Sequence, residues 1–285
     1  MIAYLNGAFV PPAELHVGYA DAGFVSGVTV TDFCRTYGRR LFRWPLHLAR
    51  FRRDCAELGI PLPPSDAEMT TAAERLVTHN APLCSTAEVA VISFATPGPL
   101  GYLTGSGADG PPTVGMHTLP LDPARYARFF ADGVTLVSAG QMPESDMLPA
   151  GVKHRSRLHW WLAGRSPDVP PGAVPVLLSA AGVADAAIGS VVIVRGDTVI
   201  RPPVGAVLEG VSLEVLAEAC AACGLRFMEA AVDFSRLCGG VDADEVWLTG
   251  SGFGVAGVRE VRHGDARRTF AWPGSRLRQV EAAWA

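Results

Sequence analysis

Lysine is almost absent from this sequence of 285 residues, in which arginine supplies 23 of the 24 lysine and arginine positions and Lys153 supplies the remaining one. The two residue types are equivalent on most solvated faces, but the guanidinium group of arginine does not lose its proton in proteins. A shielded lysine amine can lose its proton and attack a carbonyl carbon. Lys153 is therefore a candidate Schiff-base lysine. Composition alone leaves open the alternative of one surface lysine in an arginine-rich chain.

An excess of positive charge and a long apolar run are also missing. The formal net charge is −4, which argues against nucleic acid as a partner. No apolar run approaches the length of a membrane-spanning helix, and the segment 1–12 lacks the basic and apolar regions of a signal peptide. We therefore expect a globular chain in the cytoplasm, with neither nucleic acid nor a membrane among its partners.

The six cysteines lack the spacing of a disulfide framework or of a zinc site. Cys220 and Cys223 form a CxxC pair, but the residues around them have the pattern of a helix that ends at Gly224. Neither a second CxxC nor a pair of histidines accompanies them. We expect buried free thiols and no bound metal.

Internal repeats and low-complexity tracts are absent too, and hydrophobic periodicity divides the chain into strands and helices. In the first part, it predicts strands over 25–36, from 41, over 87–95 and over 113–119, helices over 46–59 and 67–79, and a Gly- and Pro-rich loop over 97–112. In the second part, it predicts strands over 133–138, 173–179, 190–195, 198–201, 226–232 and 245–249, and helices over 154–164, over 212–223 and from 275.

This order of elements predicts an α/β fold, mixed with α+β, in two domains. We expect a smaller N-terminal α/β domain over 1–120, an interdomain connection over 121–129, and a larger, mixed and β-rich domain over 130–285. A cleft between two such domains is a frequent place for a cofactor. Lys153 would stand at the start of a helix and project into that cleft.

Four short motifs occur in order along the chain. Leu5–Val10 reads LNGAFV, His47–Arg50 reads HLAR, Pro202–Ser212 reads PPVGAVLEGVS, and Ala243–Ser251 reads ADEVWLTGS. Together with the lysine segment they resemble the class IV aminotransferase family, the fold type IV pyridoxal-phosphate enzymes that include branched-chain and D-amino acid aminotransferases and aminodeoxychorismate lyase. The resemblance covers essentially the whole chain. It implies a two-domain fold with a cofactor cleft, pyridoxal 5′-phosphate as the cofactor, and a homodimer.

The resemblance also implies a role for each matching residue. Lys153 matches the catalytic lysine that forms the internal aldimine with the cofactor and then moves the α-proton of the substrate. Arg50 matches an arginine that binds the cofactor phosphate, although a solvated helix arginine has the same local pattern. Gly252 matches a residue beside the substrate carboxylate. The remaining positions that match cofactor-binding residues are Leu208, Val211, Ser212 and Ser251. Ser212 opens a predicted helix, where free backbone N–H groups suit a phosphate and where an ordinary N-cap is also expected.

One departure from the family concerns the pyridine ring of the cofactor. The family places a glutamate where it keeps the ring nitrogen protonated, which makes the ring an electron sink. The matching segment Val183–Ser190 carries Asp185 instead, whose side chain is one methylene shorter. Either the backbone lies closer, or a water bridges the gap, or the contact is lost. A structural aspartate at the end of a strand, in a turn after Gly182, is the alternative.

Other departures concern the substrate. Thr29 and Thr31 occupy the strand where several members carry a phenolic residue, and Phe94 replaces an arginine. The segment Lys153–Leu158 reads KHRSRL and resembles the KHxNRL of the lyase. Within it, Arg155 is a candidate partner for a substrate carboxylate, with a solvated helix arginine as the alternative.

Three functions follow from these features. The first is an aminotransferase that moves an amino group from an amino acid to a 2-oxo acid, as a homodimer in which the loop 97–112 of one subunit lines the pocket of the other. The second is a lyase of the aminodeoxychorismate type, which releases pyruvate. The third is a family member with weakened catalysis that binds the cofactor. The sequence leaves the donor, the acceptor and the preference for L or D substrates open.

Overall fold

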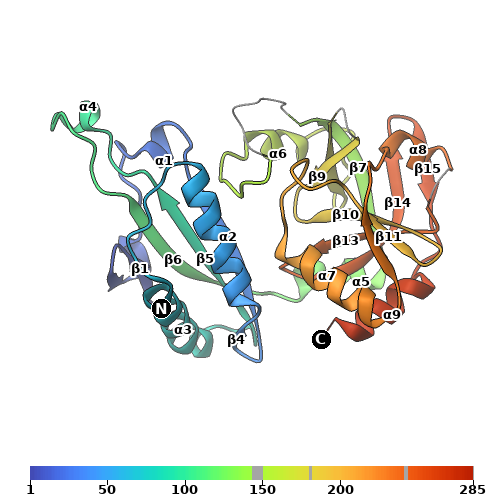
Figure 1. Ribbon diagram of the computed structural model, residues 1–285, viewed down its shortest axis with the longest axis horizontal. Coiled ribbons are helices and arrows are strands. Elements are labelled where there is room, and N and C mark those ends of the chain that lie inside the picture. Colours follow the sequence, from blue (N-terminus) through green and yellow to red (C-terminus); the bar gives the residue numbers. More distant parts are fainter. Residues whose placement is uncertain (143–149, 180–181, 241–242, 285) are drawn as a thin grey trace. The chain divides into compact units, whose positions relative to one another are not determined.

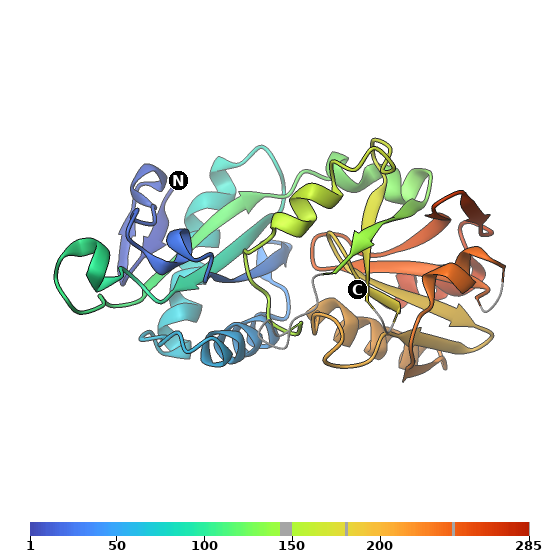
Figure 2. The ribbon, with the colours of Figure 1, turned by 90° about the horizontal axis from the view of Figure 1, so that it is seen from above.

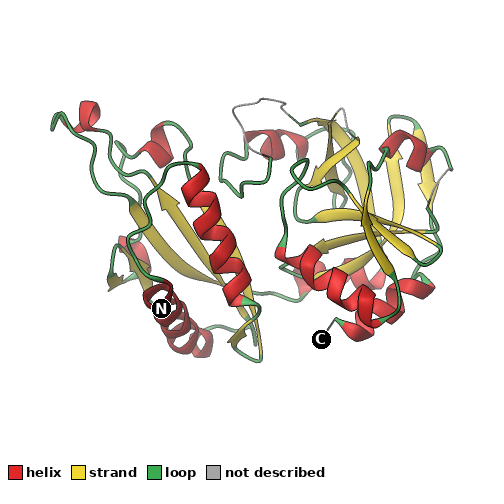
Figure 3. Cartoon of the chain, viewed as in Figure 1, coloured by secondary structure: helices red, strands yellow, loops and turns green. Residues whose placement is uncertain are grey.

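The first 122 residues and the segment Val152–Ser156 form one unit of the chain, and Pro123–Gly151 with Arg157–Ala285 form a second unit (Figure 1). We call them the N-terminal unit and the C-terminal unit. The computed structural model describes residues 1–142, 150–179, 182–240 and 243–284. Both units combine helices with a sheet (Figure 3).

The N-terminal unit is built on an antiparallel sheet of six strands in the order β2-β1-β6-β5-β3-β4. The strands are β1 (Ala3–Leu5), β2 (Ala8–Val10), β3 (Val30–Tyr37), β4 (Arg40–Leu41), β5 (Val89–Thr96) and β6 (Thr113–Pro120). Helices α2 (Trp44–Glu57) and α3 (Asp66–Asn80) cover the sheet. Shorter helices are η1 (Pro12–Glu14), α1 (Ala22–Val25), η2 (Ala81–Leu83) and α4 (Gly101–Thr104).

Successive side chains along each strand alternate between the two faces of this sheet. Val30 of β3 and Ala95 of β5 are opposite each other and belong to the buried cluster that contains Phe51 of α2. Successive strand residues point to opposite faces. The next pair, Thr31 and Phe94, therefore lies on the face that the helices do not cover.

The C-terminal unit contains a nine-stranded sheet, with the order β12-β11-β10-β13-β14-β7-β8-β9 and with β15 paired to β14. Figure 2 shows these strands curling round one another. The strands are β7 (Val134–Gln141), β8 (Val174–Ser179), β9 (Gly182–Ala186), β10 (Ser190–Arg195), β11 (Thr198–Arg201), β12 (Arg226–Glu229), β13 (Glu245–Gly250), β14 (Gly254–His263) and β15 (Ala266–Thr269). The helices are α5 (Ala124–Ala131), α6 (Leu158–Ala163), α7 (Val211–Ala222), α8 (Phe234–Cys238) and α9 (Ser275–Ala283).

Strand β10 shows how this sheet is stabilised on both faces. Val191 and Ile193 belong to one buried cluster, whereas Val192 and Val194 belong to another that includes α7 and α9. A strand buried on both faces has a continuous apolar run rather than an alternating one. The sequence VVIV over 191–194 fits this position.

Most predicted elements are confirmed, with differences at their ends. The helices predicted over 46–59, 67–79 and 212–223 correspond to α2, α3 and α7. The strand predicted from 25 begins at Val30, because the residues before it form α1 and a turn. The helix predicted over 154–164 is wrong at its start, since α6 begins at Leu158 and His154 bridges Val30 instead. The predicted domain limits stay predictions.

The thiols are as expected. All six cysteines are free, and four of them are buried. Burial raises the pKa of the Cys55 and Cys220 thiols to about 12, so both are unreactive near neutral pH. Among the described residues, no group of three side chains is arranged to hold a metal ion, and no helix is long and apolar enough to cross a membrane.

Candidate functional site

Lys153 lies in an extended segment beside the first residues of β3. The Lys153 carbonyl accepts a hydrogen bond from Thr31 N at 2.9 Å, and Arg155 N donates to the Thr29 carbonyl at 2.8 Å. These bonds use backbone groups of Lys153 and Arg155 for pairing with the strand, which explains why the helix starts only after them. The lysine is therefore held at the edge of the sheet of the N-terminal unit.

A buried carboxylate on α2 accepts a hydrogen bond from the backbone N–H of Lys153. Asp54 is 1% exposed, and its Oδ2 accepts a hydrogen bond from Lys153 N at 2.9 Å. Its Oδ1 accepts bonds from Arg53 Nε and Nη2 at 3.1 and 2.8 Å. Both oxygens of this buried group are thus used, and one of them fixes the position of Lys153 relative to α2.

We expect the Asp54→Ala variant to be destabilised by about 1–3 kcal/mol, because Lys153 N would lose its carboxylate acceptor in a partly buried place. The measurement is urea-induced unfolding of the variant and of the parent chain. The control is Glu57→Ala, which removes an exposed acid from the same helix and should change the free energy of unfolding by less than about 0.5 kcal/mol. Equal, small effects of both substitutions would contradict the positioning role of Asp54.

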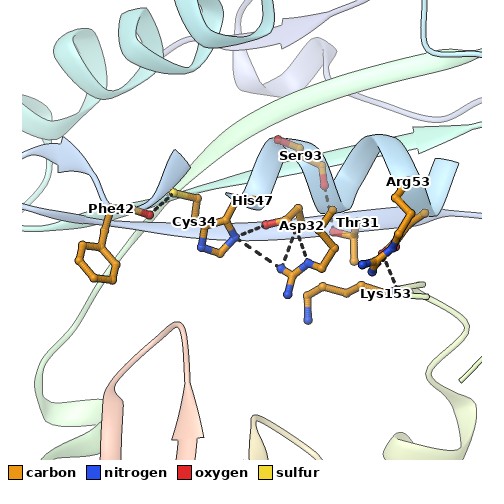
Figure 4. Close-up of polar contacts among 10 residues, drawn as sticks. Thr31, Asp32, Cys34, Phe42, His47, Arg53, Ser93 and Lys153 are labelled. Atoms are coloured by element: carbon orange, nitrogen blue, oxygen red, sulfur yellow. Dashed lines mark hydrogen bonds and ion pairs between the residues drawn. The ribbon is translucent and has the colours of Figure 1, made fainter. Parts of the chain in front are cut away.

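Arg50 belongs to a buried polar cluster with Asp32 and His47, and Figure 4 labels Asp32 and His47. Its Nε and Nη2 donate to Asp32 Oδ2 at 2.9 and 2.6 Å, and His47 Nδ1 lies 2.6 Å from Asp32 Oδ1. His47 and Arg50 are three residues apart on α2 and therefore share one face of the helix. In Figure 4, the Lys153 side chain extends toward the labelled residues Asp32 and His47 of this cluster.

The charges of this cluster compensate one another. Burial alone would raise the pKa of Asp32, but the charges and hydrogen bonds of Arg50 and His47 outweigh burial and hold that pKa well below its ordinary value. Asp32 is therefore ionised at neutral pH. Two hydrogen bonds from the guanidinium to the single oxygen Asp32 Oδ2 restrict the long arginine side chain to one geometry, so the Arg50 guanidinium is pre-positioned.

In the C-terminal unit, the first turn of α7 offers backbone donors. The N-cap residue Gly210 makes no side-chain capping hydrogen bond, and the first N–H groups of a helix lack acceptors within the helix. Ser212, in this first turn, is buried. The Thr249 hydroxyl of β13 donates to the Gly254 carbonyl at 3.0 Å, and the Ser212 carbonyl lies 3.5 Å from the same hydroxyl oxygen, so β13 lies beside the start of α7. Such a helix start favours an anion.

Ser251 and Gly252 lie in the turn that joins β13 to β14. A Cβ atom at Gly252 would lie 2.8 Å from the hydroxyl oxygen of Tyr126. A larger residue at position 252 would therefore have to displace the end of the Tyr126 side chain. Ser251 is partly exposed.

Asp185 is a strand residue rather than a turn residue. It lies in β9, opposite Leu177 of β8, next to a register shift between these strands. Its Oδ1 accepts a hydrogen bond from Ala186 N at 3.0 Å. The side chain is partly exposed. The strand begins at Gly182 and continues through Asp185, so Asp185 lies near the end of a strand and not in a turn directly after Gly182. Its role beside the cofactor ring stays a prediction.

The predicted site residues fall into two groups, one in each unit. The N-terminal unit holds Thr29, Thr31, Arg50, Lys153 and Arg155, and its hydrogen bonds bring Lys153 and Arg155 beside the two threonines. The C-terminal unit holds Asp185, Leu208, Val211, Ser212, Ser251 and Gly252. The role assigned to each of these residues stays a prediction.

Three residues of the N-terminal group were missed: Asp32, His47 as a partner of Asp32, and Asp54. A signal for Asp54 exists in the sequence, because it follows the buried Phe51 by three positions and so shares its helix face. Asp32 lies two residues after Val30 and two before Cys34, on the strand face that is otherwise apolar. An acidic residue on a face predicted to be buried indicates a pairing partner.

Known proteins share the sequence pattern of this chain. The profile of the family described as "Amino-transferase class IV" matches residues 29–261. A D-alanine aminotransferase from Bacillus licheniformis is 25% identical over 250 residues, which cover 87% of this chain and 84% of that protein. A D-alanine aminotransferase from Staphylococcus aureus (strain N315) is 38% identical over 77 residues, and this match spans only 27% of this chain and 27% of the length of that relative.

Solved structures share the fold. A hypothetical aminotransferase from Mycobacterium tuberculosis in its PLP-bound form superposes with a TM-score of 0.82 at 21% identity, over 100% of this chain and 99% of that chain. The branched-chain amino acid aminotransferase from Escherichia coli gives a TM-score of 0.79 at 16% identity, over 98% and 92% of the two chains. The predicted mixed α/β, fold type IV architecture is confirmed. Since the family profile also spans most of the sequence, the chain belongs to the class IV aminotransferase family.

Proposed function

We propose that this chain is an aminotransferase that moves an amino group from an amino acid to a 2-oxo acid, with Lys153 as the residue that bonds the cofactor. The cofactor is pyridoxal 5′-phosphate. The observation that carries the proposal is the placement of the chain's single lysine, whose backbone N–H and carbonyl are both held by hydrogen bonds beside β3 and α2. An amine that must meet one carbon atom benefits from such pre-organisation.

The donor set fits this cofactor. When bound, pyridoxal 5′-phosphate supplies an aldehyde that takes up an amino group and a ring that withdraws electrons. The proposal assigns Arg50, Ser212, Ser251 and the backbone N–H groups at the start of α7 to its phosphate, because these are cationic or hydrogen-bond-donating groups. It assigns Leu208 and Val211 to the faces of the ring, and Asp185 to the ring nitrogen.

Each residue of the site has its own proposed role. The Lys153 amine takes the proton from the α-carbon of the amino acid and later donates a proton as the product forms. Asp32 and His47 keep the Arg50 guanidinium in one orientation. Gly252 leaves backbone room beside Ser251, where we propose that the carboxylate of the substrate is bound. Thr29, Thr31 and Arg155 are proposed to contact the substrate from the N-terminal unit.

For Asp185 we predict that the Asp185→Ala variant transfers amino groups about 10²-fold more slowly, because the ring would lose the acid that favours its protonated form. Cofactor retention should change far less, since the phosphate contacts stay in place. Stopped-flow measurement of the first half-reaction and a cofactor titration separate the two effects. Asp265→Ala, in an exposed turn of the same unit, serves as the control. Unchanged turnover in Asp185→Ala would show that this carboxylate is not the ring partner.

A product assay tests the function itself. D-alanine and L-alanine are offered as donors with a panel of 2-oxo acids, since the relatives named above are D-alanine aminotransferases. Transfer of the amino group supports the proposal. Release of pyruvate with 4-aminobenzoate from the aminodeoxychorismate-type precursor would favour the lyase, and cofactor binding with neither product would favour a member with weakened catalysis. Sedimentation analysis tests the homodimer that we propose.

A further inference from the structure

One face of β10 changes from apolar to polar at the first residue of the strand. Val192 and Val194 belong to the buried cluster that includes α7 and α9. Successive strand residues point to opposite faces, so Ser190 shares this face with the two valines. Ser190 is 5% exposed, and a polar group buried beside an apolar row needs a hydrogen-bond partner. None of the roles proposed above involves Ser190.

The hydroxyls beside the start of α7 differ in whether they have a partner. Thr249 lies directly opposite Ser190, and its hydroxyl donates to the Gly254 carbonyl at 3.0 Å. Among the described residues, the hydroxyls of Ser190 and of the 7% exposed Ser212 make no hydrogen bond. Neither oxygen is fully enclosed, because the only enclosed side-chain polar atom without a partner in the described part of the chain is a tryptophan nitrogen. Both hydroxyls are therefore accessible to a ligand.

Both hydroxyls lie beside Gly210, the N-cap residue of α7. A Cβ atom at position 210 would lie 3.4 Å from Ser212 Oγ and 3.7 Å from Ser190 Oγ, with Leu213 Cδ1 at 3.9 Å. The φ angle of Gly210 is −73°, which residues other than glycine adopt as well. The backbone conformation therefore does not require glycine here, and the lack of a side chain leaves space between the two hydroxyls.

The start of α7 adds backbone donors at the same place. Val211 N and Ser212 N belong to the first turn, where N–H groups have no acceptor within the helix. Together with the helix dipole, such groups stabilise an anion. Two hydroxyls and two N–H groups thus surround the space beside Gly210. This set of donors suits a phosphate group, whose three terminal oxygens are strong hydrogen-bond acceptors.

The neighbouring carboxylate is neutralised by an arginine. Glu209 directly precedes Gly210, and its Oε2 and Oε1 accept hydrogen bonds from Arg201 Nη1 and Nη2 at 3.2 and 2.8 Å. Arg201 is 8% exposed, and a two-pronged pair of this kind has a defined geometry. The negative charge of Glu209 is therefore offset, and the residue before Gly210 is held in place.

We propose that Ser190 is a further phosphate-binding residue, whose hydroxyl donates to a phosphate oxygen that the Ser212 hydroxyl also contacts. Gly210 provides the room for this oxygen. The inference rests on the proposed function for the identity of the ligand, pyridoxal 5′-phosphate, whereas the donors themselves recognise the phosphate group.

The first test measures the binding of inorganic phosphate to the full-length protein without cofactor, and so does not depend on turnover. Calorimetry should show binding to the parent chain that weakens about 10-fold or more in Ser190→Ala, because a hydrogen bond to a charged group is lost. Gly210→Ala should also weaken it, since the added Cβ atom takes up the space of the shared oxygen. Ser138→Ala removes a hydroxyl that lies 2.8 Å from His263 Nδ1 on β7 of the same unit, and it should leave phosphate affinity unchanged.

The second test compares pyridoxal 5′-phosphate with pyridoxal, which lacks the phosphate. Ser190→Ala should weaken the binding of pyridoxal 5′-phosphate about 10-fold or more and leave that of pyridoxal unchanged, whereas a purely structural role of Ser190 would weaken both. If amino transfer fails but inorganic phosphate binds in this Ser190-dependent way, the proposed function is wrong and the assignment of Ser190 holds. If inorganic phosphate does not bind to the parent chain, or if Ser190→Ala binds inorganic phosphate and pyridoxal 5′-phosphate as tightly as the parent chain does, the assignment is overturned, even where amino transfer succeeds.

Discussion

Replacing Lys153 with alanine is expected to lower the rate of amino transfer by about 10³-fold or more, because one substitution removes both the amine that bonds the cofactor and the base that moves the α-proton. No other lysine exists in the chain to take over either task. The visible absorbance of lysine-bound cofactor should disappear as well. Steady-state assays and absorbance spectra of the purified variants provide the measurements.

Lys153→Arg is the matched control for this prediction. It keeps a positive charge and a long side chain at the same place, but the guanidinium cannot act as an amine nucleophile. We expect it to be as inactive as Lys153→Ala while unfolding at the same urea concentration as the parent chain. Intact absorbance and turnover in Lys153→Arg would contradict the assignment.

The second large effect concerns the buried cluster of Asp32, His47 and Arg50. Arg50→Gln should weaken cofactor binding about 10- to 100-fold through the lost phosphate partner, and it should also destabilise the fold by about 3–5 kcal/mol, because Asp32 would be left as a buried charge without its main partner. Cofactor titration and urea-induced unfolding measure the two quantities. Both losses are expected because the proposal gives Arg50 two partners, the cofactor phosphate and the buried Asp32.

A double variant separates these two roles. Asp32→Asn combined with Arg50→Gln removes both charges, so much of the stability lost in Arg50→Gln should return. Cofactor affinity should stay low in the double variant, because the phosphate still lacks its arginine. Recovery of affinity together with stability would show that Arg50 acts only on the fold and does not contact the phosphate.

The sequence predicted the secondary structure around the candidate site residues where the signal is local, and it failed where the structure depends on distant partners. The helix that carries His47 and Arg50 follows from its apolar spacing, and the helix start at Gly210–Ser212 follows from its motif. The start of the helix after Lys153 was wrong, because the residues before Leu158 are hydrogen-bonded to β3, more than a hundred positions earlier. Helical periodicity contains no information about such a partner.

The buried aspartates also show that local sequence patterns do not reveal distant partners. Asp32 and Asp54 have ordinary local surroundings in the sequence, and their roles emerge only when their partners are placed. Lys153 is the opposite case. Its rarity in the composition is enough to single it out, while the hydrogen bonds that hold its backbone come from Thr31 and Asp54.

Borohydride reduction of the cofactor-loaded protein, followed by peptide mass spectrometry, tests the central claim most directly. Reduction makes the bond between an amine and the cofactor permanent, and the chain offers one lysine to carry it. We predict a single addition of the reduced cofactor, located on the peptide that contains Lys153. Reduced protein without any addition, or with the addition on the N-terminal amine, would contradict the account.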